Sequence, residues 1–446
     1  MRILIQVGSG IIFLSLAFMI YKFQVKQKGR EVQFLALIIL LAFIFHAFKN
    51  YLFSHYFNAG YPLGTFLFRP EDRFNDFFNM INICKDNNPY MTDYFFQSNY
   101  FPLANTFFWL VSKIGTGFPV FLGYILIFAF FYFLFLRKVI VKDQSIGAVV
   151  SLVIIGLLNY PFLMNIDRGN LEAWMFLLLL AFFYFYDRGR IYAAILFLAL
   201  AIAMKLFPAV FLILLLKDKK YKEILITVFI ACLVTVLGLL SFQGGPESNI
   251  VAMFNSFRMF NSLTSFDGMQ HNSSLFGFIK VWVLISQEIF NGVVDPATVK
   301  NAVPFAPYAI AVFVAFFVLV IFILRKEHER WKDIMCLTII MILFPNVSFD
   351  YRLIYLFIPL GYFLERNIRT NRDNIFLLLF SFLLIPQSYI YIFRDISVSA
   401  LIYPIVMILF LALMLFEGNS SRKEQNPLKL PIQPSNHQNK KLGRFN

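Results

Sequence analysis

Runs of apolar residues alternate with short polar stretches along almost the whole chain. Stretches of about 20 apolar residues are typical of helices that cross a bilayer, where a helix satisfies its own backbone hydrogen bonds. The pattern predicts an all-α, polytopic membrane protein, a bundle of about 13 transmembrane helices. The predicted helices span 3–21, 33–54, 119–136, 145–164, 171–186, 191–205, 206–216, 224–242, 303–324, 333–345, 352–364, 374–393 and 398–416.

Composition narrows the class of protein. A mean hydropathy of +0.71 and 59% hydrophobic residues exclude a soluble globular chain. The first apolar run precedes a basic stretch rather than a small-residue cleavage site, so we expect no cleavable signal peptide. The three cysteines show no metal-like spacing, and no P-loop, dinucleotide fingerprint or paired-His zinc motif is found. A cytosolic ATP- or NAD-dependent reaction is therefore not expected.

The distribution of basic residues sets the expected topology. Alternate connections and the tail after residue 416 hold 26 of the 39 Lys and Arg residues. The positive-inside rule places this set in the cytoplasm, so the N-terminus lies outside and the C-terminus inside. The formal net charge of +14 is then explained by topology and attraction to the membrane surface, without nucleic acid. Loops 55–118 and 243–302 face outward. We expect a multi-pass protein of a bacterial inner membrane.

The same pattern divides the chain into two parts. Residues 1–416 form a single transmembrane domain, and residues 417–446 form a basic cytoplasmic tail that we expect to be disordered.

Two of the predicted hairpins are too short to cross the membrane. Segments 191–216 and 333–364 enter from the cytoplasmic side, and their arms hold about 15 residues or fewer, roughly 22 Å against a core of roughly 30 Å. Their tips carry Lys205 and Arg352, each near a proline. A broken helix at that depth is tolerated where it lines a polar cavity, and a cation there suits a phosphate. The alternative is that both cations snorkel to the outer interface.

The first outer loop holds three acids within six positions, Glu71, Asp72 and Asp76. Carboxylates near hydrocarbon are costly and are commonly functional, and one of them could take a proton from an attacking hydroxyl. Arg69 and Arg73 could instead neutralise Glu71 and Asp72. Since Asp76 has no cation within two positions, it is the sharper candidate for a base. Residues 103–115 are predicted to form a helix along the outer interface.

Two further outer stretches gather polar groups. Asp167, Arg168 and Asn170 lie in a short turn, where an Asp–Arg pair could be only a local salt bridge. His271 and Asn272 precede two serines that could instead cap a helix. His271 could donate a hydrogen bond to a phosphate, although a lone histidine is often structural.

Several short motifs occur together, in order and with the expected loop placement. They are Asp76-Phe-Phe, Asn88-Pro-Tyr90, Tyr100-Phe-Pro102, Arg168-Gly-Asn170, Lys205-Leu-Phe-Pro208, His271-Asn-Ser-Ser274 and Phe344-Pro-Asn-Val-Ser-Phe-Asp350-Tyr351. Between about residues 70 and 365 the chain resembles the GT-C glycosyltransferases, in particular family 87, the polyprenol-phosphate-mannose-dependent mannosyltransferases. It departs from that family in carrying Asp350 and Tyr351 where a histidine is often found, and in its extra N-terminal helix.

The resemblance implies a GT-C-like fold and an inverting transfer of a sugar, mannose in this family, from a polyprenyl-phosphate donor to a lipid or glycan acceptor on the outer face. The family's catalytic base carries over to Asp76, with Asp72 and Glu71 as the version that uses adjacent acids. Donor phosphate-binding residues would be Lys205, Arg352, Arg168 and His271. Substrate-binding residues would be Tyr90, Asn88, Asn170, Asn272 and Asp350.

The residues themselves leave two other functions open, and they also leave the question of a metal open. Paired broken hairpins also build transporter and lipid-flippase sites, although here both enter from one side. A polymerase or ligase acting on lipid-linked glycans would share the outer loops but not the early acidic one. No cofactor is identified: one clear base argues against a metal, whereas three clustered acids leave room for a divalent cation.

Overall fold

Helices build almost the entire protein. The computed structural model describes residues 2–24, 30–92, 94, 97–141, 145–267, 269–291, 304–325, 329–366, 372–393 and 396–420. Within these ranges the β-structure consists of one small antiparallel pair, β1 (Tyr391–Phe393) with β2 (Ile396–Ser397), and an isolated bridge between Asn272 and Phe349. The predicted all-α class is confirmed, while the tail beyond residue 420 lies outside the described residues.

The helices follow the predicted apolar runs closely. In chain order the first are α1 (Arg2–Gln24), α2 (Glu31–Phe57), η1 (Pro70–Asp72), α3 (Asn75–Cys84), α4 (Pro102–Ile114), α5 (Phe118–Ile140), α6 (Ile146–Leu158), α7 (Tyr160–Arg168), α8 (Glu172–Asp187) and α9 (Ile191–Met204). The rest are η2 (Phe207–Phe211), α10 (Leu212–Lys217), α11 (Tyr221–Leu240), α12 (Pro246–Asp267), α13 (Leu275–Asn291), α15 (Phe305–Arg325), α16 (Arg330–Leu343), η3 (Asp350–Leu356), α17 (Phe357–Glu365), α18 (Asp373–Leu384) and α19 (Ser399–Ser420).

Fewer helices than predicted can cross a membrane alone. Among the described residues, α2, α5, α11, α15 and α19 are long and apolar enough, and α6 with α7 makes a sixth if this pair, bent by 44°, counts as one span. The predicted number of 13 is not confirmed. Some predicted spans, including α9, α10 and α18, are shorter apolar helices, and the span predicted over 374–393 ends at Leu384. Partial-length helices pack beside full-length ones here, which a hydropathy pattern does not distinguish.

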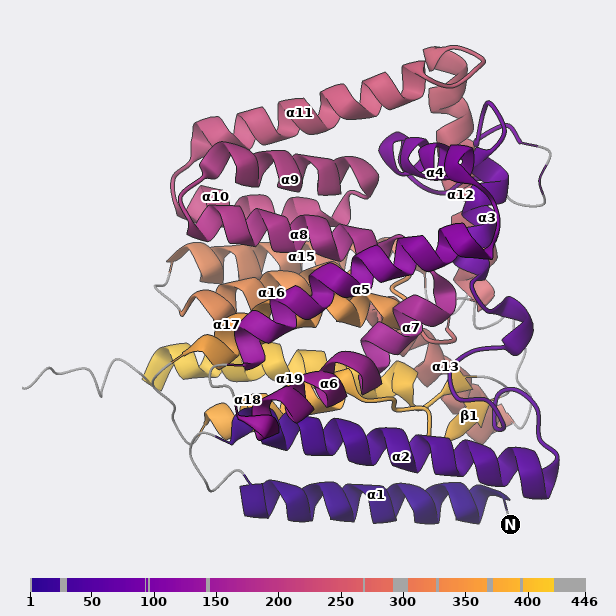
Figure 1. Cartoon of the computed structure of the whole chain (residues 1–446), viewed down its shortest axis with the longest axis vertical. Coiled ribbons are helices and arrows are strands. Elements are labelled where there is room, and N and C mark those ends of the chain that lie inside the picture. Colours follow the sequence, from indigo (N-terminus) through magenta and orange to yellow (C-terminus); the bar gives the residue numbers. More distant parts are fainter. Residues whose placement is uncertain are drawn as a thin grey trace, which may run out of the picture.

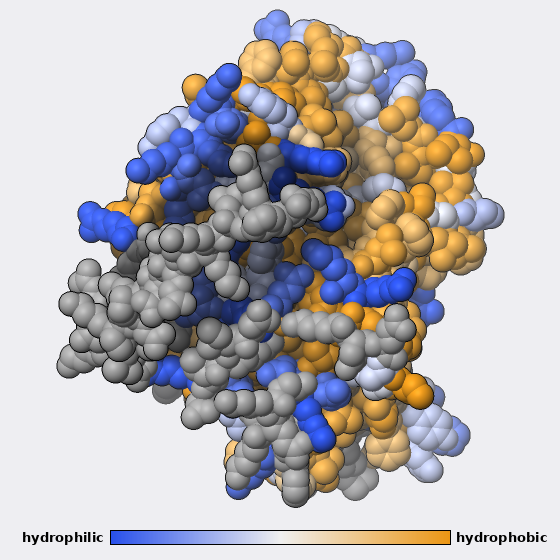
Figure 2. Space-filling model, turned by 60° about the vertical axis from the view of Figure 1, so that its left-hand side comes forward, coloured by the Kyte–Doolittle hydropathy of each residue, from blue (hydrophilic) through white to orange (hydrophobic). Residues whose placement is uncertain are grey.

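The long helices lie side by side, and their ends gather at two opposite ends of the bundle (Figure 1). At one end lie the last turns of α8 and α10 and the first turn of α16. Ion pairs join these helix ends, including Lys217 to Asp333 at 2.5 Å and Arg330 to Asp187 at 2.8 Å. Figure 2 shows hydrophilic residues gathered on this end beside a broad hydrophobic surface. This is the end predicted to be cytoplasmic.

The opposite end, which we call the site end, holds α3, α4, α7 and α13 (Figure 1). The two predicted hairpin breaks also occur. Helix α9 stops at Met204 and the chain returns through the short 3₁₀ helix η2, and α16 stops at Leu343 and returns through η3. Pro208 lies at the start of η2, as predicted, whereas Pro345 lies in a turn before η3. The helix predicted over 103–115 is α4, which contacts α3, α9 and α11.

The turn between α7 and α8 depends on a glycine. Asn159 begins α7 by accepting a hydrogen bond from the Phe162 amide at 2.9 Å, and Gly169 ends it with a left-handed φ of 65°. A Cβ at residue 169 would lie 2.8 Å from Phe77 Cβ and 2.9 Å from the Phe121 ring. The chain therefore turns tightly against α3 and α5, and the turn fixes Arg168 and Asn170.

We expect Gly169→Ala to destabilise the protein by about 1–2 kcal/mol for the left-handed conformation and by about 1–3 kcal/mol more for overpacking. Gly189→Ala is the matched control, because Gly189 also has a left-handed φ of 69° but a Cβ there meets nothing within 4 Å. Thermal unfolding in detergent would measure both. An equal loss for both variants would show that packing at Gly169 contributes nothing.

Candidate active site

The first acidic loop delivers Asp76 to the start of a helix. Phe74 adopts a left-handed φ of 64°, and its amide donates to the carbonyl of Asp167 at 2.7 Å. Helix α3 begins at the next residue, so Asp76 lies in its first turn. A carboxylate there is favoured by the helix dipole.

Two residues from the α7–α8 turn hold Asp76. Arg168 Nη2 donates to Oδ1 at 2.5 Å, and Asn170 Nδ2 donates to Oδ2 at 2.7 Å. Arg168 also donates to the Asp72 carbonyl at 2.9 Å, and its guanidinium lies 4.5 Å from the centre of the Phe68 ring. Asp76 has no cation within two positions in the sequence, but the fold brings Arg168 to it from 92 positions away. The Asp76 side chain is 20% exposed.

The other residues of the acidic loop are arranged differently from the predicted salt bridges. Arg73 lies 3.5 Å from Asp167, and Arg69 lies over the Tyr61 ring. Asp72 accepts a hydrogen bond from Asn75 at 2.9 Å, and Glu71 is exposed. The three acids therefore do not converge on one point.

The cations of the two hairpin tips meet at one buried carboxylate, Glu172, at the start of α8. Lys205 Nζ donates to Glu172 Oε1 at 2.8 Å, and Arg352 Nε donates to the same oxygen at 3.0 Å. The Tyr355 hydroxyl donates to Oε2. The Glu172 side chain is 1% exposed, so it is held by partners rather than by water. Lys205 and Arg352 therefore lie near one another, and neither snorkels to the surface.

Tyr100 links the two groups of charges. Its hydroxyl lies 3.3 Å from Asn170 Nδ2, and Lys205 Nζ lies 4.5 Å from the centre of its ring. Burial, and next the neighbouring Asp76 carboxylate, raise the pKa of Tyr100, so its hydroxyl stays protonated. Two carboxylates, Asp76 and Glu172, thus face the three cations Arg168, Lys205 and Arg352. One positive charge is left over.

A second buried network contains His271. Asp350 accepts hydrogen bonds from Ser273 at 2.6 Å and from Tyr160 at 2.8 Å, and His271 Nδ1 lies 3.6 Å from its Oδ2. His271 has a left-handed φ of 49°, and its Nε2 is buried without a hydrogen-bond partner. The centre of its ring lies 5.3 Å from the centre of the Phe68 ring, and the Arg168 guanidinium also packs on this Phe68 ring. Phe68 therefore lies between the two networks.

The α12–α13 loop clamps the second hairpin tip. Asn272 Oδ1 accepts from the amides of Ser274 and Ser348, both at 2.9 Å, and Ser273 N donates to the Ser348 carbonyl at 2.7 Å. Asp350 N donates to the His271 carbonyl at 2.9 Å. These hydrogen bonds fix the backbone that leads to Arg352. They join two polar segments that lie far apart in the sequence, residues 271–274 and 346–350.

Comparison with known protein families identifies the family of this chain. The model of glycosyltransferase family 87 matches residues 96–345, more than half of the chain. The chain belongs to glycosyltransferase family 87. No curated protein and no solved structure matches it. The protein is thus a glycosyltransferase, and together with its apolar helices this makes it a membrane enzyme. The matched segment is shorter than the predicted resemblance over residues 70–365, and it leaves out Asp76, Asp350 and Arg352.

Three residues predicted to bind substrate in this family 87 enzyme are engaged with the protein itself. Asn88 donates to Gln243 O at 2.6 Å and to Asn249 at 2.7 Å, and the Tyr90 hydroxyl donates to the Tyr100 carbonyl at 2.7 Å. Asn272 accepts the hydrogen bonds that join the α12–α13 loop to the second hairpin tip. Their substrate-binding roles stay predictions. In the structure, hydrogen bonds from Asn88 and Tyr90 support the loop that contains Tyr100.

Two concave regions flank the site end of the glycosyltransferase. An apolar groove of about 400 Å³ runs between α15 and the two hairpin tips; it is lined by Phe207, Val210, Phe305, Tyr308, Ala309, Val312, Phe313, Phe316, Ile340, Met341, Phe344, Pro345 and Asn346. The Arg352 guanidinium lies 4.1 Å from the centre of the Phe207 ring, so the groove ends beside the cations.

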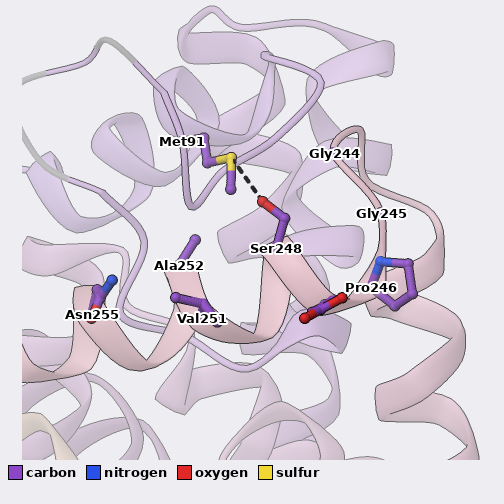
Figure 3. Close-up of a pocket in the computed structure, with 9 residues that line it drawn as sticks. Met91, Gly244, Gly245, Pro246, Ser248, Val251, Ala252 and Asn255 are labelled. Carbon is purple, nitrogen blue, oxygen red and sulfur yellow. Dashed lines mark hydrogen bonds between the residues drawn. The ribbon is translucent and has the colours of Figure 1, made fainter.

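The second concavity, of about 650 Å³, lies where α12 begins. Figure 3 shows Gly244, Gly245 and Pro246 at its edge and Ser248 pointing toward Met91. None of the predicted site residues lines it.

Glu172, Tyr100 and Phe68 are residues of the candidate site that sequence reasoning did not select. Glu172 was visible as an acid opening an apolar helix, and two cations at apolar hairpin tips imply a carboxylate partner. Within the described residues, no group of three or more His, Cys, Asp or Glu side chains is arranged to hold a metal ion.

We expect Glu172→Gln to destabilise the enzyme by about 3–5 kcal/mol, because it leaves two buried cations without their carboxylate. Glu329→Gln is the control, since Glu329 pairs with Arg366 but its side chain is 47% exposed, and about 0–1 kcal/mol is expected there. Adding Lys205→Met to Glu172→Gln should restore part of the loss. Thermal unfolding would measure all three, and similar losses for Glu172→Gln and Glu329→Gln would contradict a buried charge cluster.

Proposed function

We propose that this glycosyltransferase transfers a sugar, mannose by its resemblance to family 87, from a polyprenyl phosphate to a lipid or glycan acceptor. The reaction inverts the anomeric carbon and takes place on the outer face of the membrane of a bacterial cell. The observation that carries the proposal is the cluster of three cations and two carboxylates at the end of an apolar groove. That arrangement suits a molecule with an anionic head and an apolar tail.

The donor phosphate would bind between Lys205 and Arg352. Lys205 has three N–H donors and uses one on Glu172, while Arg352 uses Nε on Glu172 and Nη1 on the Val347 carbonyl. Both therefore keep donors for a phosphate without releasing Glu172. The unbalanced positive charge of the cluster favours an anion, and it would stabilise the charge that develops on the leaving phosphate.

The polyprenyl tail would lie in the groove between α15 and the hairpin tips. Apolar side chains line most of this groove, and α15 is one of the membrane-crossing helices. Phe207 lines the groove, and its ring also packs against the Arg352 guanidinium. The tail and the phosphate would therefore meet at this ring. A donor that enters sideways from the bilayer needs no nucleotide-binding fold, which fits the absence of such motifs from the sequence.

Asp76 would act as the general base. Each of its oxygens holds one hydrogen bond, from Arg168 or Asn170, and each keeps a second lone pair for an acceptor hydroxyl. As the acceptor oxygen bonds to the anomeric carbon, its proton passes to Asp76 and the bond from that carbon to the phosphate oxygen breaks. Arg168, predicted to bind phosphate, instead positions the base in this proposal. His271 Nε2, which has no partner, would donate to the substrate.

We expect Asp76→Asn to lower sugar transfer about 10²–10⁴-fold, because the acceptor proton loses its destination. The assay supplies membranes with a radiolabelled polyprenyl-phosphate mannose and follows label in the acceptor. Asp72→Asn and Glu71→Gln are the matched controls in the same loop and should keep most activity. Unchanged transfer by Asp76→Asn would remove Asp76 as the base, and loss in Glu71→Gln alone would move that role to Glu71.

We expect Ala309→Trp, which fills the groove, to raise KM for a long-chain polyprenyl donor more than for a short-chain donor. Ala315→Trp on the same helix is the control, since Ala315 is exposed and does not line the groove. Equal KM changes for both donors in Ala309→Trp would place the tail elsewhere.

A further inference from the structure

The buried face of α2 changes from apolar to polar along its length. Near the predicted cytoplasmic end it carries Phe34, Ile38 and Ala42, and further on it carries His46, Lys49, Asn50 and Phe53. The spacing of three and four residues places this second set on one side of the helix. His46, Lys49 and Asn50 are 2%, 3% and 6% exposed. Three buried polar side chains in a membrane-crossing helix are costly and are commonly functional.

Three segments enclose this polar set. Lys49 Nζ donates to the Ser388 carbonyl at 2.6 Å and lies 5.3 Å from the centre of the Tyr391 ring. His46 Nε2 lies 3.1 Å from the Phe66 carbonyl and 3.2 Å from Ser388 Oγ. The walls are thus α2, the loop before η1 and the chain between α18 and β1. We call this place the α2 polar site.

The charge of the α2 polar site is not balanced. Lys205 and Arg352, which are similarly buried, share the carboxylate of Glu172. Among the described residues Lys49 forms no ion pair with a carboxylate. A buried cation without a counter-charge is strongly unfavourable. An anion from outside the chain would supply the missing charge.

Several buried hydrogen-bonding atoms of these residues and of their neighbours in the sequence also lack partners among the described residues. They are His46 Nδ1, both polar atoms of the Asn50 side chain, Thr65 Oγ1 and Gln387 Oε1. Buried polar atoms are nearly always paired, with protein groups or with ordered water. When Nε2–H of His46 donates to the Phe66 carbonyl, Nδ1 is an acceptor, so the donors come from Lys49, Asn50 and Thr65. A cation with several neutral donors is a set that recognises a phosphate.

The depth of the site favours a lipid as the source of that phosphate. Lys49 precedes the end of the 27-residue helix α2 by eight residues, or about 12 Å, so it lies in the half of the helix that is predicted to face outward. Neighbouring Phe48 and Tyr51 are exposed on the same helix, so lipid reaches its surface there. We propose that the α2 polar site binds the phosphate of an anionic membrane lipid, separately from the sugar donor.

Binding there would affect the catalytic loop through a short connection. The Phe66 carbonyl contacts His46, and Phe68, two residues later, lies under Arg168. A lipid phosphate that fixes His46 and Lys49 therefore holds the loop that leads to Asp76. His46, Lys49 and Ser388 all lie outside residues 96–345, the segment that family 87 shares. The α2 polar site is thus a feature of this chain beyond the family match.

The test measures thermal unfolding of the full-length protein in detergent, with phosphatidylglycerol, phosphatidylcholine or inorganic phosphate added. We expect phosphatidylglycerol to raise the unfolding temperature by a few degrees, with a smaller effect of the other two. Lys49→Met should abolish this rise and should also raise the unfolding temperature without lipid, because it removes an unbalanced charge. Lys85→Gln is the control, since Lys85 is exposed, and it should behave as the unchanged protein.

Three outcomes would overturn the proposal. If Lys49→Met lowers the lipid-free unfolding temperature and keeps the lipid response, Lys49 is only a structural donor to Ser388. If inorganic phosphate alone gives the full rise, the ligand is the free anion and not a lipid. If Lys85→Gln loses the response as well, the lipid acts through surface charge. Because the readout is stability, its failure is separate from failure of the proposed sugar transfer.

Discussion

The arrangement of this protein depends on one buried carboxylate. Glu172 opens α8 and accepts hydrogen bonds from Lys205 and Arg352, which come from the tips of two hairpins that do not span the bundle. Moving three charges out of water is expensive, and only their mutual attraction and further hydrogen bonds offset the cost. The tips are therefore held at one depth, and the broken helices can end inside the protein rather than at its surface.

That constraint also shapes the neighbouring chemistry. The turn that leads from α7 to Glu172 carries Arg168 and Asn170, and these hold Asp76. The cluster keeps one positive charge in excess, beside a groove that is largely apolar. The partners of Asp76 and the carboxylate of Glu172 thus depend on the same turn, where Gly169 permits the close approach of α7 to α3 and α5.

Polar groups at the site end form two further sets with different partners. The His271–Asp350 network fixes the second hairpin tip, whereas the α2 polar site holds a buried cation whose described partner is a carbonyl and not a carboxylate. Phe68 packs against Arg168 and His271 and so joins the acidic loop to both the charge cluster and this tip.

The sequence by itself determined the helical class, the apolar runs, the two helix breaks and the gathering of basic residues at one end. These follow from hydrophobicity and charge, which act locally along the chain. It also selected Asp76, Lys205 and Arg352 as chemically unusual. Only the tertiary structure decided which charges pair, because Arg168 reaches Asp76 from 92 positions away and Glu172 joins residues 33 and 180 positions distant. Hydropathy likewise could not separate full membrane spans from partial ones, since packing against neighbours determines where a short apolar helix lies.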